Sequence, residues 1–95
     1  MAGIELWKVE EIEHYLRDRF VNYEVEHFFK GDQTACLFVL LQWDRDGKKK
    51  VVHQLLAMRK FLDRFQDRTS LAGSLSAGDV VMRMLKAGDR TVELY

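Results

Sequence analysis

The most apolar segment of the chain covers residues 35–43, where Gln42 is the one polar side chain. Turn-forming sequences stand on either side of it, at 30–33 and 44–47. A strand that is apolar on both of its alternating faces needs cover on both faces, or a central place in a sheet that is covered. The pattern therefore predicts that 35–43 is the central strand of the fold.

The preceding residues, 21–29, alternate between two kinds of side chain. One face carries Val21, Tyr23, Val25, His27 and Phe29, and the other carries Asn22, Glu24, Glu26 and Phe28. This period of two predicts a peripheral strand with one exposed face. Because a short connection with Gly31 and Asp32 follows, we expect an antiparallel hairpin with the apolar strand.

The chain before this hairpin has helical periodicity. Val9, Ile12, Leu16 and Phe20 recur at spacings of three and four residues, which predicts an amphipathic helix. Acidic residues crowd its first turns and basic residues its end, as the helix dipole favours. Residues 4–7 also alternate, so a short strand before this helix remains an alternative.

Residues 48–67 permit two interpretations. Apolar residues recur at helical spacing, which favours a helix over about 49–67; they are Val51, Leu55, Met58, Leu62 and Phe65. Three lysines at a helix N-terminus are unfavourable, however. The turn at 46–47 could instead open a third strand, with a shorter helix beginning near Ala57.

The last third of the chain predicts a loop, a helix and a strand. Residues 69–78 are mostly small and hydroxylic, which favours a loop. Ser76 and Asp79 have the spacing of a capping box, so a helix should run from there to about residue 87. Gly88 would end it in the left-handed conformation, and 91–95 would form a closing strand.

These elements give the order helix, strand, strand, helix, helix, strand. We expect one α+β domain over residues 1–95, with the helices on one face of a three-stranded mixed sheet. The order resembles that of the bacterial type of KH domain and, more loosely, the BolA-like fold. Gly73 and Gly78 do not have the KH Gly-x-x-Gly spacing, and Gln54 follows His53 where BolA proteins have an Arg-His segment. No functional residue of either family is therefore carried over.

Composition excludes several protein classes. With 47% apolar and 32% charged residues, the chain is typical of a globular domain. No apolar run approaches the roughly 20 residues of a membrane span, and the first residues lack the pattern of a signal peptide. We therefore expect a soluble cytoplasmic protein without membrane contact. Cys36 is the single cysteine and lies in the apolar strand, which indicates a buried packing residue.

No motif names a reaction. The three histidines, His14, His27 and His53, lack metal-ligand spacing. The sequence at 44–47 resembles the opening of a calcium loop, but lysines follow it. Asp79 stands where the lysine of a phosphate loop would be. We therefore expect no catalytic residue, no metal and no small-molecule cofactor.

Our first hypothesis is a non-catalytic protein-interaction module that binds a protein partner or forms a homodimer. The exposed face or edge of the strand at 21–29 would supply an acidic and aromatic contact surface. Its candidate residues are Tyr23, Glu24, Glu26, Phe28 and Trp43.

The alternative is a small RNA-binding module. Residues 45–68 hold eight basic and three acidic residues although the chain has no net charge. The candidate phosphate contacts are Arg45, Lys48, Lys49, Lys50, Arg59, Lys60 and Arg64. A near-neutral isoelectric point counts against this function.

Overall fold

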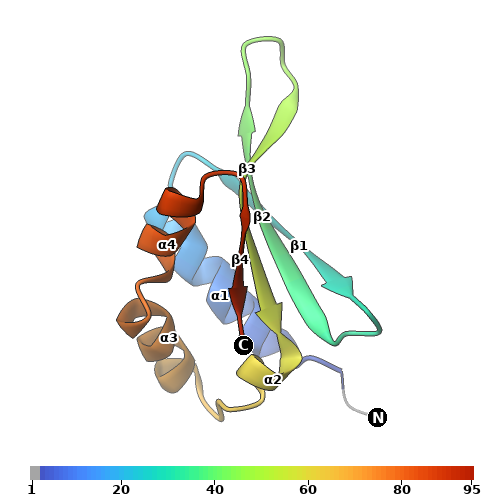
Figure 1. The fold of residues 1–95 in the computed structure, drawn as a ribbon, viewed down its shortest axis with the longest axis vertical. Helices are drawn as coiled ribbons and strands as arrows, with labels where there is room; N and C mark the ends of the chain where they lie inside the picture. The colour runs from blue at the N-terminus through green and yellow to red at the C-terminus, as the bar shows by residue number, and fades with distance from the viewer. Residues whose placement is uncertain (1–2) are drawn as a thin grey trace.

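A four-stranded mixed sheet with helices on one face forms the fold (Figure 1). The computed structural model describes residues 3–95. The elements in chain order are α1 (Leu6–Arg19), β1 (Glu24–Lys30), β2 (Ala35–Trp43), β3 (Lys49–Met58), α2 (Arg59–Leu62), α3 (Arg68–Ala77), α4 (Val80–Ala87) and β4 (Thr91–Leu94). The α+β architecture expected from the sequence is confirmed, with one strand more than expected.

The strand order is β1-β2-β3-β4, so the apolar strand β2 is internal and β1 lies at an edge. The first three strands pair antiparallel, and β4 pairs parallel to β3. A parallel neighbour needs a crossover connection, which α2, α3 and α4 provide. The β2–β3 hairpin extends beyond the body of the molecule (Figure 1). The described structure as a whole, hairpin included, measures 43 × 28 × 20 Å.

The helix expected over 49–67 is wrong, and the alternative third strand is present as β3. The turn before β3 accounts for this. The Asp44 carboxylate accepts hydrogen bonds from the backbone N–H groups of Asp46 and Lys48, at 2.9 and 3.0 Å. Gly47 has a φ of 76°, a left-handed conformation that glycine adopts without strain. The chain therefore reverses and pairs with β2, and a lysine-rich strand avoids the unfavourable helix dipole.

The loop expected over 69–78 is also wrong, because α3 occupies these residues. Its N-cap is Asp67, whose carboxylate accepts the backbone N–H of Ser70 at 2.8 Å. Leu71 and Leu75 are fully buried and hold the helix against the core. Ser76 lies inside α3, so it does not form the expected capping box. The strand considered at 4–7 is absent, since α1 begins at Leu6.

Asp79 precedes α4 in the left-handed conformation, with a φ of 53° and no side-chain capping hydrogen bond. Gly88 ends α4 with a φ of 63°, the positive value expected for it. None of the helices described over residues 3–95 is long and apolar enough to cross a membrane.

The hydrophobic core lies between the sheet and the helices. Its strand residues include Val25, Cys36, Phe38, Leu40, Leu55, Ala57, Val92 and Leu94, and its helix residues include Val9, Ile12, Leu16, Leu71, Leu75, Val80 and Met84. Burial raises the pKa of the Cys36 thiol to about 12. Cys36 is therefore a packing residue, as its place in the apolar strand indicates.

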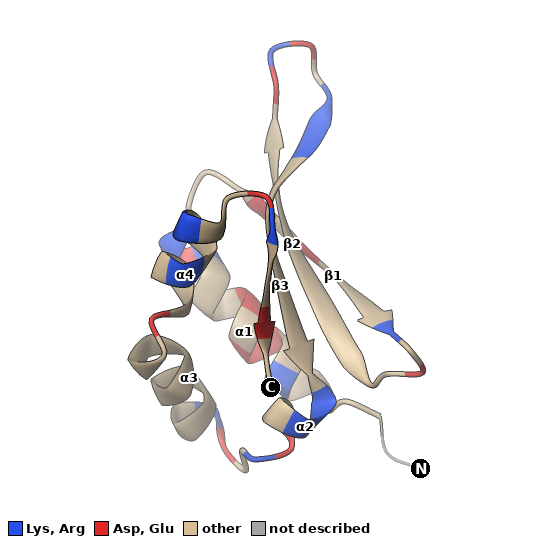
Figure 2. Cartoon of the chain, in the orientation of Figure 1, with Lys and Arg blue, Asp and Glu red and all other residues tan. Residues whose placement is uncertain are grey.

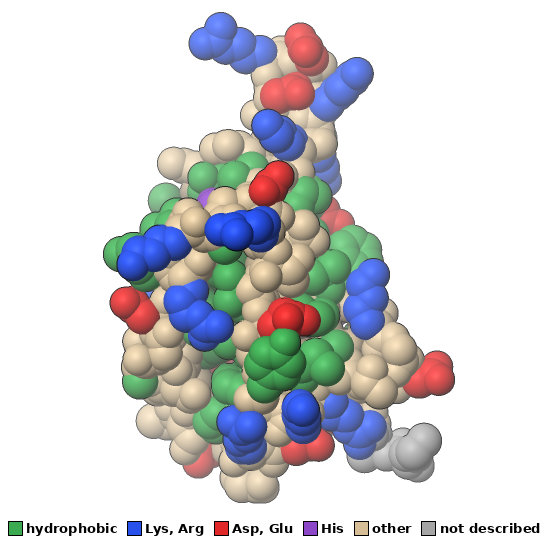
Figure 3. Space-filling view, in the orientation of Figure 1, with side chains coloured by type: hydrophobic (Ala, Val, Ile, Leu, Met, Phe, Trp, Pro, Cys, Tyr) green, Lys and Arg blue, Asp and Glu red, His purple; other side chains and the backbone are tan. Residues whose placement is uncertain are grey.

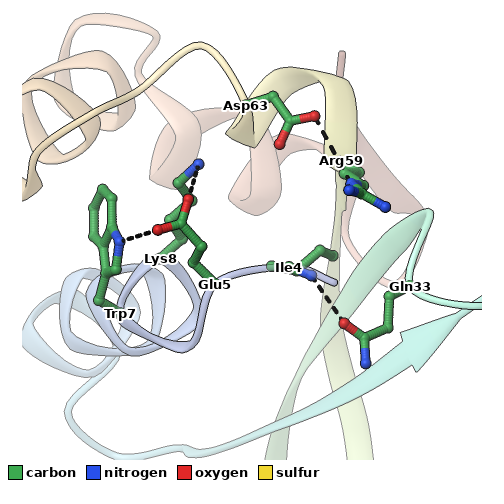
Figure 4. Close-up of polar contacts among 7 residues, drawn as sticks. All are labelled: Ile4, Glu5, Trp7, Lys8, Gln33, Arg59 and Asp63. Atoms are coloured by element: carbon green, nitrogen blue, oxygen red, sulfur yellow. Dashed lines mark hydrogen bonds and ion pairs between the residues drawn. The ribbon is translucent and has the colours of Figure 1, made fainter. Parts of the chain in front are cut away.

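The segment before α1 is attached to the β1–β2 turn (Figure 4). The backbone N–H of Ile4 donates to Gln33 Oε1 at 2.8 Å. Glu5 accepts a hydrogen bond from Trp7 Nε1 at 2.9 Å and pairs with Lys8 Nζ at 3.2 Å. Lys8 is almost fully buried, so the Glu5 carboxylate supplies the opposite charge that a buried ammonium group requires.

Candidate protein-interaction surface

One face of the sheet faces away from the helices. Alternate residues of β2 contribute to it, and the strand register places Phe28 of β1 and Leu56 of β3 on either side of Leu37. We call this surface the open face and define it by Phe28, Leu37, Val39, Leu41, Trp43, Val51 and Leu56. Val39 and Leu41 are buried but do not belong to the core cluster on the helix side.

The open face combines a buried apolar centre with exposed apolar side chains around it. Val39 and Leu41 are covered by neighbouring strands, with 6% and 9% of their surface exposed. Phe28, Trp43 and Val51 are 49%, 57% and 39% exposed. Scattered exposed apolar residues are ordinary, whereas these share one face of the sheet, which makes it the candidate contact surface of the chain.

A charged cluster fixes one corner of the open face. Lys49 Nζ lies 2.9 Å from a Glu24 carboxylate oxygen and 3.6 Å from one of Glu26. Trp43 Nε1 donates to Glu24 at 3.2 Å, and Lys49 Nζ lies 5.1 Å from the centre of the Trp43 ring. Hydrogen bonds from Lys49 and then Trp43 lower the pKa of Glu24, and the same Glu24 contact raises the pKa of Lys49. These contacts orient the Trp43 indole across the strand ends.

The structure thus brings together four of the five residues predicted for protein contact: Glu24, Glu26, Phe28 and Trp43. Tyr23 is elsewhere. It precedes β1, and its ring packs at 5.5 Å from Phe20 and 6.0 Å from His53, on the helix side of the sheet. Tyr23 is therefore a core neighbour and not a part of the open face.

The outer edge of β1 adjoins the open face. Over the residues that the structure describes, β1 pairs with β2 alone. The backbone groups on its other side are therefore available to another strand. Phe29, which points to the helix side, is 40% exposed at this edge.

The basic residues predicted to contact phosphate do not form one surface. Arg45 and Lys48 lie in the β2–β3 turn, with Lys49 and Lys50 at the start of β3, while Arg59, Lys60 and Arg64 lie at or beyond its end. A strand of ten residues spans about 30 Å. Figure 2 shows the two groups at opposite ends of the molecule.

The cations of the α2 end have neighbours of their own. Arg59 Nε lies 3.8 Å from an Asp63 carboxylate oxygen (Figure 4). The charged groups of Lys60 and Arg64 lie 5.7 and 5.9 Å from the ring centres of Tyr95 and Phe61. These cations therefore lie over aromatic rings or beside a carboxylate of their own region.

A second basic group was missed by sequence reasoning. Arg83, Lys86 and Arg90 line a shallow depression of about 460 Å³ between α4 and β4. Figure 3 shows several cationic side chains on this side of the molecule. The available signal was the concentration of basic residues around Gly88, at the end of the last helix.

Two of the three histidines considered as metal ligands have other partners in the structure. His53 is buried, and its Nδ1–H donates to the carbonyl oxygen of Gly88 at 2.9 Å. His27 Nδ1 lies 2.7 Å from a Glu13 carboxylate oxygen. Across residues 3–95, no three His, Cys, Asp or Glu side chains are grouped so that they could hold a metal ion.

Comparisons with protein-family models, with curated proteins and with solved structures gave no match. The resemblance to KH and BolA-like folds therefore rests on element order alone.

Proposed function

We propose that this chain is a non-catalytic protein-interaction module that binds through the open face and the adjoining edge of β1, with a second copy of itself as a partner. The observation that carries the proposal is the double-sided apolar character of β2. Its helix-side residues are enclosed, while Leu37, Val39 and Leu41 lie on a face that no described helix covers.

The composition of this surface supports protein binding. Interfaces commonly have an apolar centre with aromatic anchors and a polar rim. Here Phe28 supplies exposed aromatic area opposite Leu37, and Trp43 supplies it beyond the buried Leu41 on the same face of β2. Glu24, Glu26 and Lys49 supply charges at the margin. Lys49 pairs with both carboxylates, so the three groups together leave a single negative charge at this margin of the surface.

Sedimentation velocity over about 5 µM to about 1 mM protein tests self-association. We expect the wild-type chain to show a concentration-dependent increase in sedimentation coefficient. Phe28→Asp should remove this increase, because it replaces an exposed aromatic side chain next to the β1 edge with a carboxylate, two residues from Glu26 on the same face of the strand.

Met82→Asp is the matched control. Met82 is 45% exposed, close to the 49% of Phe28, but lies in the first turn of α4, away from the sheet surface. An acidic residue in the first turn of a helix is favourable, so this variant should fold and associate like the wild type. A wild-type protein that stays monomeric over the whole range, or an equal effect of both variants, would contradict the proposal.

RNA binding is a second candidate, favoured by one observation. The turn that contains Asp89 lies against the base of the β2–β3 hairpin, because Gln54 Nε2 donates to the Asp89 carbonyl oxygen at 3.3 Å. Arg90 and the cations of the hairpin, Lys48 and Lys50, can therefore serve one side of the molecule.

The test of this candidate is the fluorescence anisotropy of a single-stranded RNA at about 50 and about 200 mM salt. If the basic side binds phosphate, affinity falls steeply with salt and falls further in Arg90→Glu and Lys48→Glu. Absence of binding at the lower salt concentration refutes it.

A further inference from the structure

We propose that two copies of this chain pair through their β1 strands, antiparallel, with His27 opposite its own copy. The inference rests on the proposed function, because it specifies how self-association occurs. It starts from the free edge of β1, which has no neighbouring strand in Figure 1. Strand addition to such an edge is a common mode of protein recognition.

Symmetry restricts the possible registers. A twofold axis between two antiparallel copies of one strand places one residue opposite itself, because the same surface is used on both sides. Centring on Glu26 would place two identical carboxylates together, which is unfavourable. Centring on Phe28 would pair five of the seven residues of β1 with one another. Centring on His27 pairs all seven.

The charges of β1 are complementary in the His27 register. Glu24 lies opposite Lys30 of the second copy, and the symmetry repeats this pair at the other end of the strand. Glu24 and Lys30 are an even number of residues apart on β1, so both side chains project from the open face. Among residues 3–95, Lys30 makes no ion pair, so it is available to a carboxylate of the second copy. Opposite charges directly across an antiparallel pair are stabilising.

The His27 register also places apolar residues of the two β1 strands opposite each other. In this register Val25 lies opposite Phe29 of the second copy, and both project to the helix side. Beside Val25 is a depression of about 490 Å³, which Arg17, Val21, Tyr23 and Glu24 also line. The Phe29 ring, 40% exposed in one copy, would enter the depression of the other. Centring on Phe28 would instead bring Gly31 to this position, which has no side chain to fill it.

The pairing would join the two sheets into one of eight strands. Because the twofold axis stands perpendicular to the sheet, the two open faces would lie side by side on the same surface. Phe28 of each copy would then lie at the junction, opposite Glu26 of the other copy, so the edge pairing uses this part of the open face. The β2 and β3 residues of the two open faces would form one continuous apolar surface on the same side of the joined sheet.

Disulfide cross-linking tests the register. In the proposed pair, the Cα atoms of residue 27 and its copy lie about 4.5–5.5 Å apart, within the range of a disulfide. The two copies of residue 26, or of residue 28, lie about 7–8 Å apart, beyond that range. Oxidised His27→Cys should form a covalent dimer, whereas Glu26→Cys and Phe28→Cys should do so poorly. The native thiol of Cys36 is buried and does not compete.

Charge exchange gives an independent measurement that does not depend on residue 27. Lys30→Glu places carboxylates opposite each other at two symmetric positions, and we expect about tenfold weaker dimerisation by sedimentation. The double variant Glu24→Lys with Lys30→Glu restores opposite charges across the pair, so its affinity should recover. Glu26→Lys with Lys30→Glu is the matched control, and it should not recover in this register.

The outcomes separate the two proposals. Cross-linking of His27→Cys together with recovery in the Glu24 and Lys30 exchange supports the register. A dimer that cross-links through Phe28→Cys, or recovers with the Glu26 exchange, overturns the register and leaves self-association standing. A wild-type chain that is monomeric at about 1 mM overturns both.

Discussion

Leu40 and Leu41 are adjacent residues of β2 whose side chains lie on opposite faces of the sheet. Substituting each in turn therefore compares how well the two faces are covered. Leu40 is fully buried in the core cluster against the helices. Leu41 is 9% exposed and lies on the open face. Changing each to alanine removes the same three carbon atoms from the same strand. The two variants therefore differ mainly in what surrounds the deleted atoms.

The expected costs differ by about a factor of two. The transfer contribution of three buried carbons is about 2 kcal/mol for either residue. Around Leu40 the helices and sheet enclose the vacated space, so the substitution leaves a cavity. The cavity adds to the transfer contribution and brings the loss in free energy of unfolding to about 4 kcal/mol. At Leu41 water and neighbouring side chains reach the vacated space, so the cost should stay near about 2 kcal/mol.

Urea unfolding followed by circular dichroism measures both values. With a slope of about 1 kcal/mol per molar urea, the two midpoints should differ by about 2 M. The protein is kept dilute so that association does not stabilise either variant. If Leu40→Ala does not fold, Leu40→Val and Leu41→Val provide the same comparison with smaller losses.

Equal costs at the two positions would refute the reasoning. They would mean that Leu41 is enclosed as completely as Leu40, and that the face assigned here as open is covered. The proposed interaction surface would then lose its physical basis.

Three further predictions concern single residues. Asp67→Ala removes the N-cap of α3 and should lower stability by about 1 kcal/mol, which thermal unfolding would register as a decrease of about 4–8 °C; an unchanged midpoint would show that the cap contributes nothing. The Cys36 thiol, whose pKa burial raises to about 12, should resist alkylation at pH 8 in the folded protein and react in urea, so rapid native labelling would contradict its burial. Hydrogen bonds from Lys49 and Trp43 lower the pKa of Glu24. The ionised Glu24 therefore stabilises the fold above its usual pKa of 4.5, and this stabilisation is lost as the pH falls through the lowered pKa. The indole N–H resonance of Trp43 should shift over that acidic range, and a constant resonance would argue against the contact.

The sequence predicted the elements in which local and tertiary preferences agree. β2 has the bounds expected for it, 35–43, because its apolar run and its flanking turns indicate the same strand. Residues 49–58 were misassigned because their apolar positions satisfy both a period of two and a helical spacing. Pairing with β2 decided between them, and that interaction is not local.

The helix at 68–77 could not be predicted from its composition. Serine and threonine commonly favour turns, and Gly73 weakens an isolated helix. Burial of Leu71 and Leu75 against the core overrides these preferences, and Asp67 caps a helix that begins at Arg68, one residue before the expected loop.

The candidate surface was predictable only where the strand alternation holds. Counting by twos from Phe28 correctly placed Glu24 and Glu26 on the same face. The same counting places Tyr23 on the opposite face, with Val25, and the structure has it on that side, packed against the core. Its inclusion among the contact residues was therefore wrong by the alternation itself. Tyr23 ends the turn that precedes β1, where its backbone N–H donates to the Phe20 carbonyl oxygen at 3.1 Å. The basic residues of 45–64 were separated because an extended strand is about twice as long per residue as a helix.

β2 is apolar on both of its faces, but the helices of the fold cover only one of them. A strand buried on both faces gains stability on each, and here the helices supply cover to the face of Phe38 and Leu40. On the other face, neighbouring strands shield Val39 and Leu41 but leave Phe28 and Trp43 half exposed. Burial of that remaining area would stabilise a complex, and the unpaired β1 strand lies directly beside it. A partner that adds to the β1 edge can therefore use the backbone and the open face together, which is why both belong to one proposed binding surface.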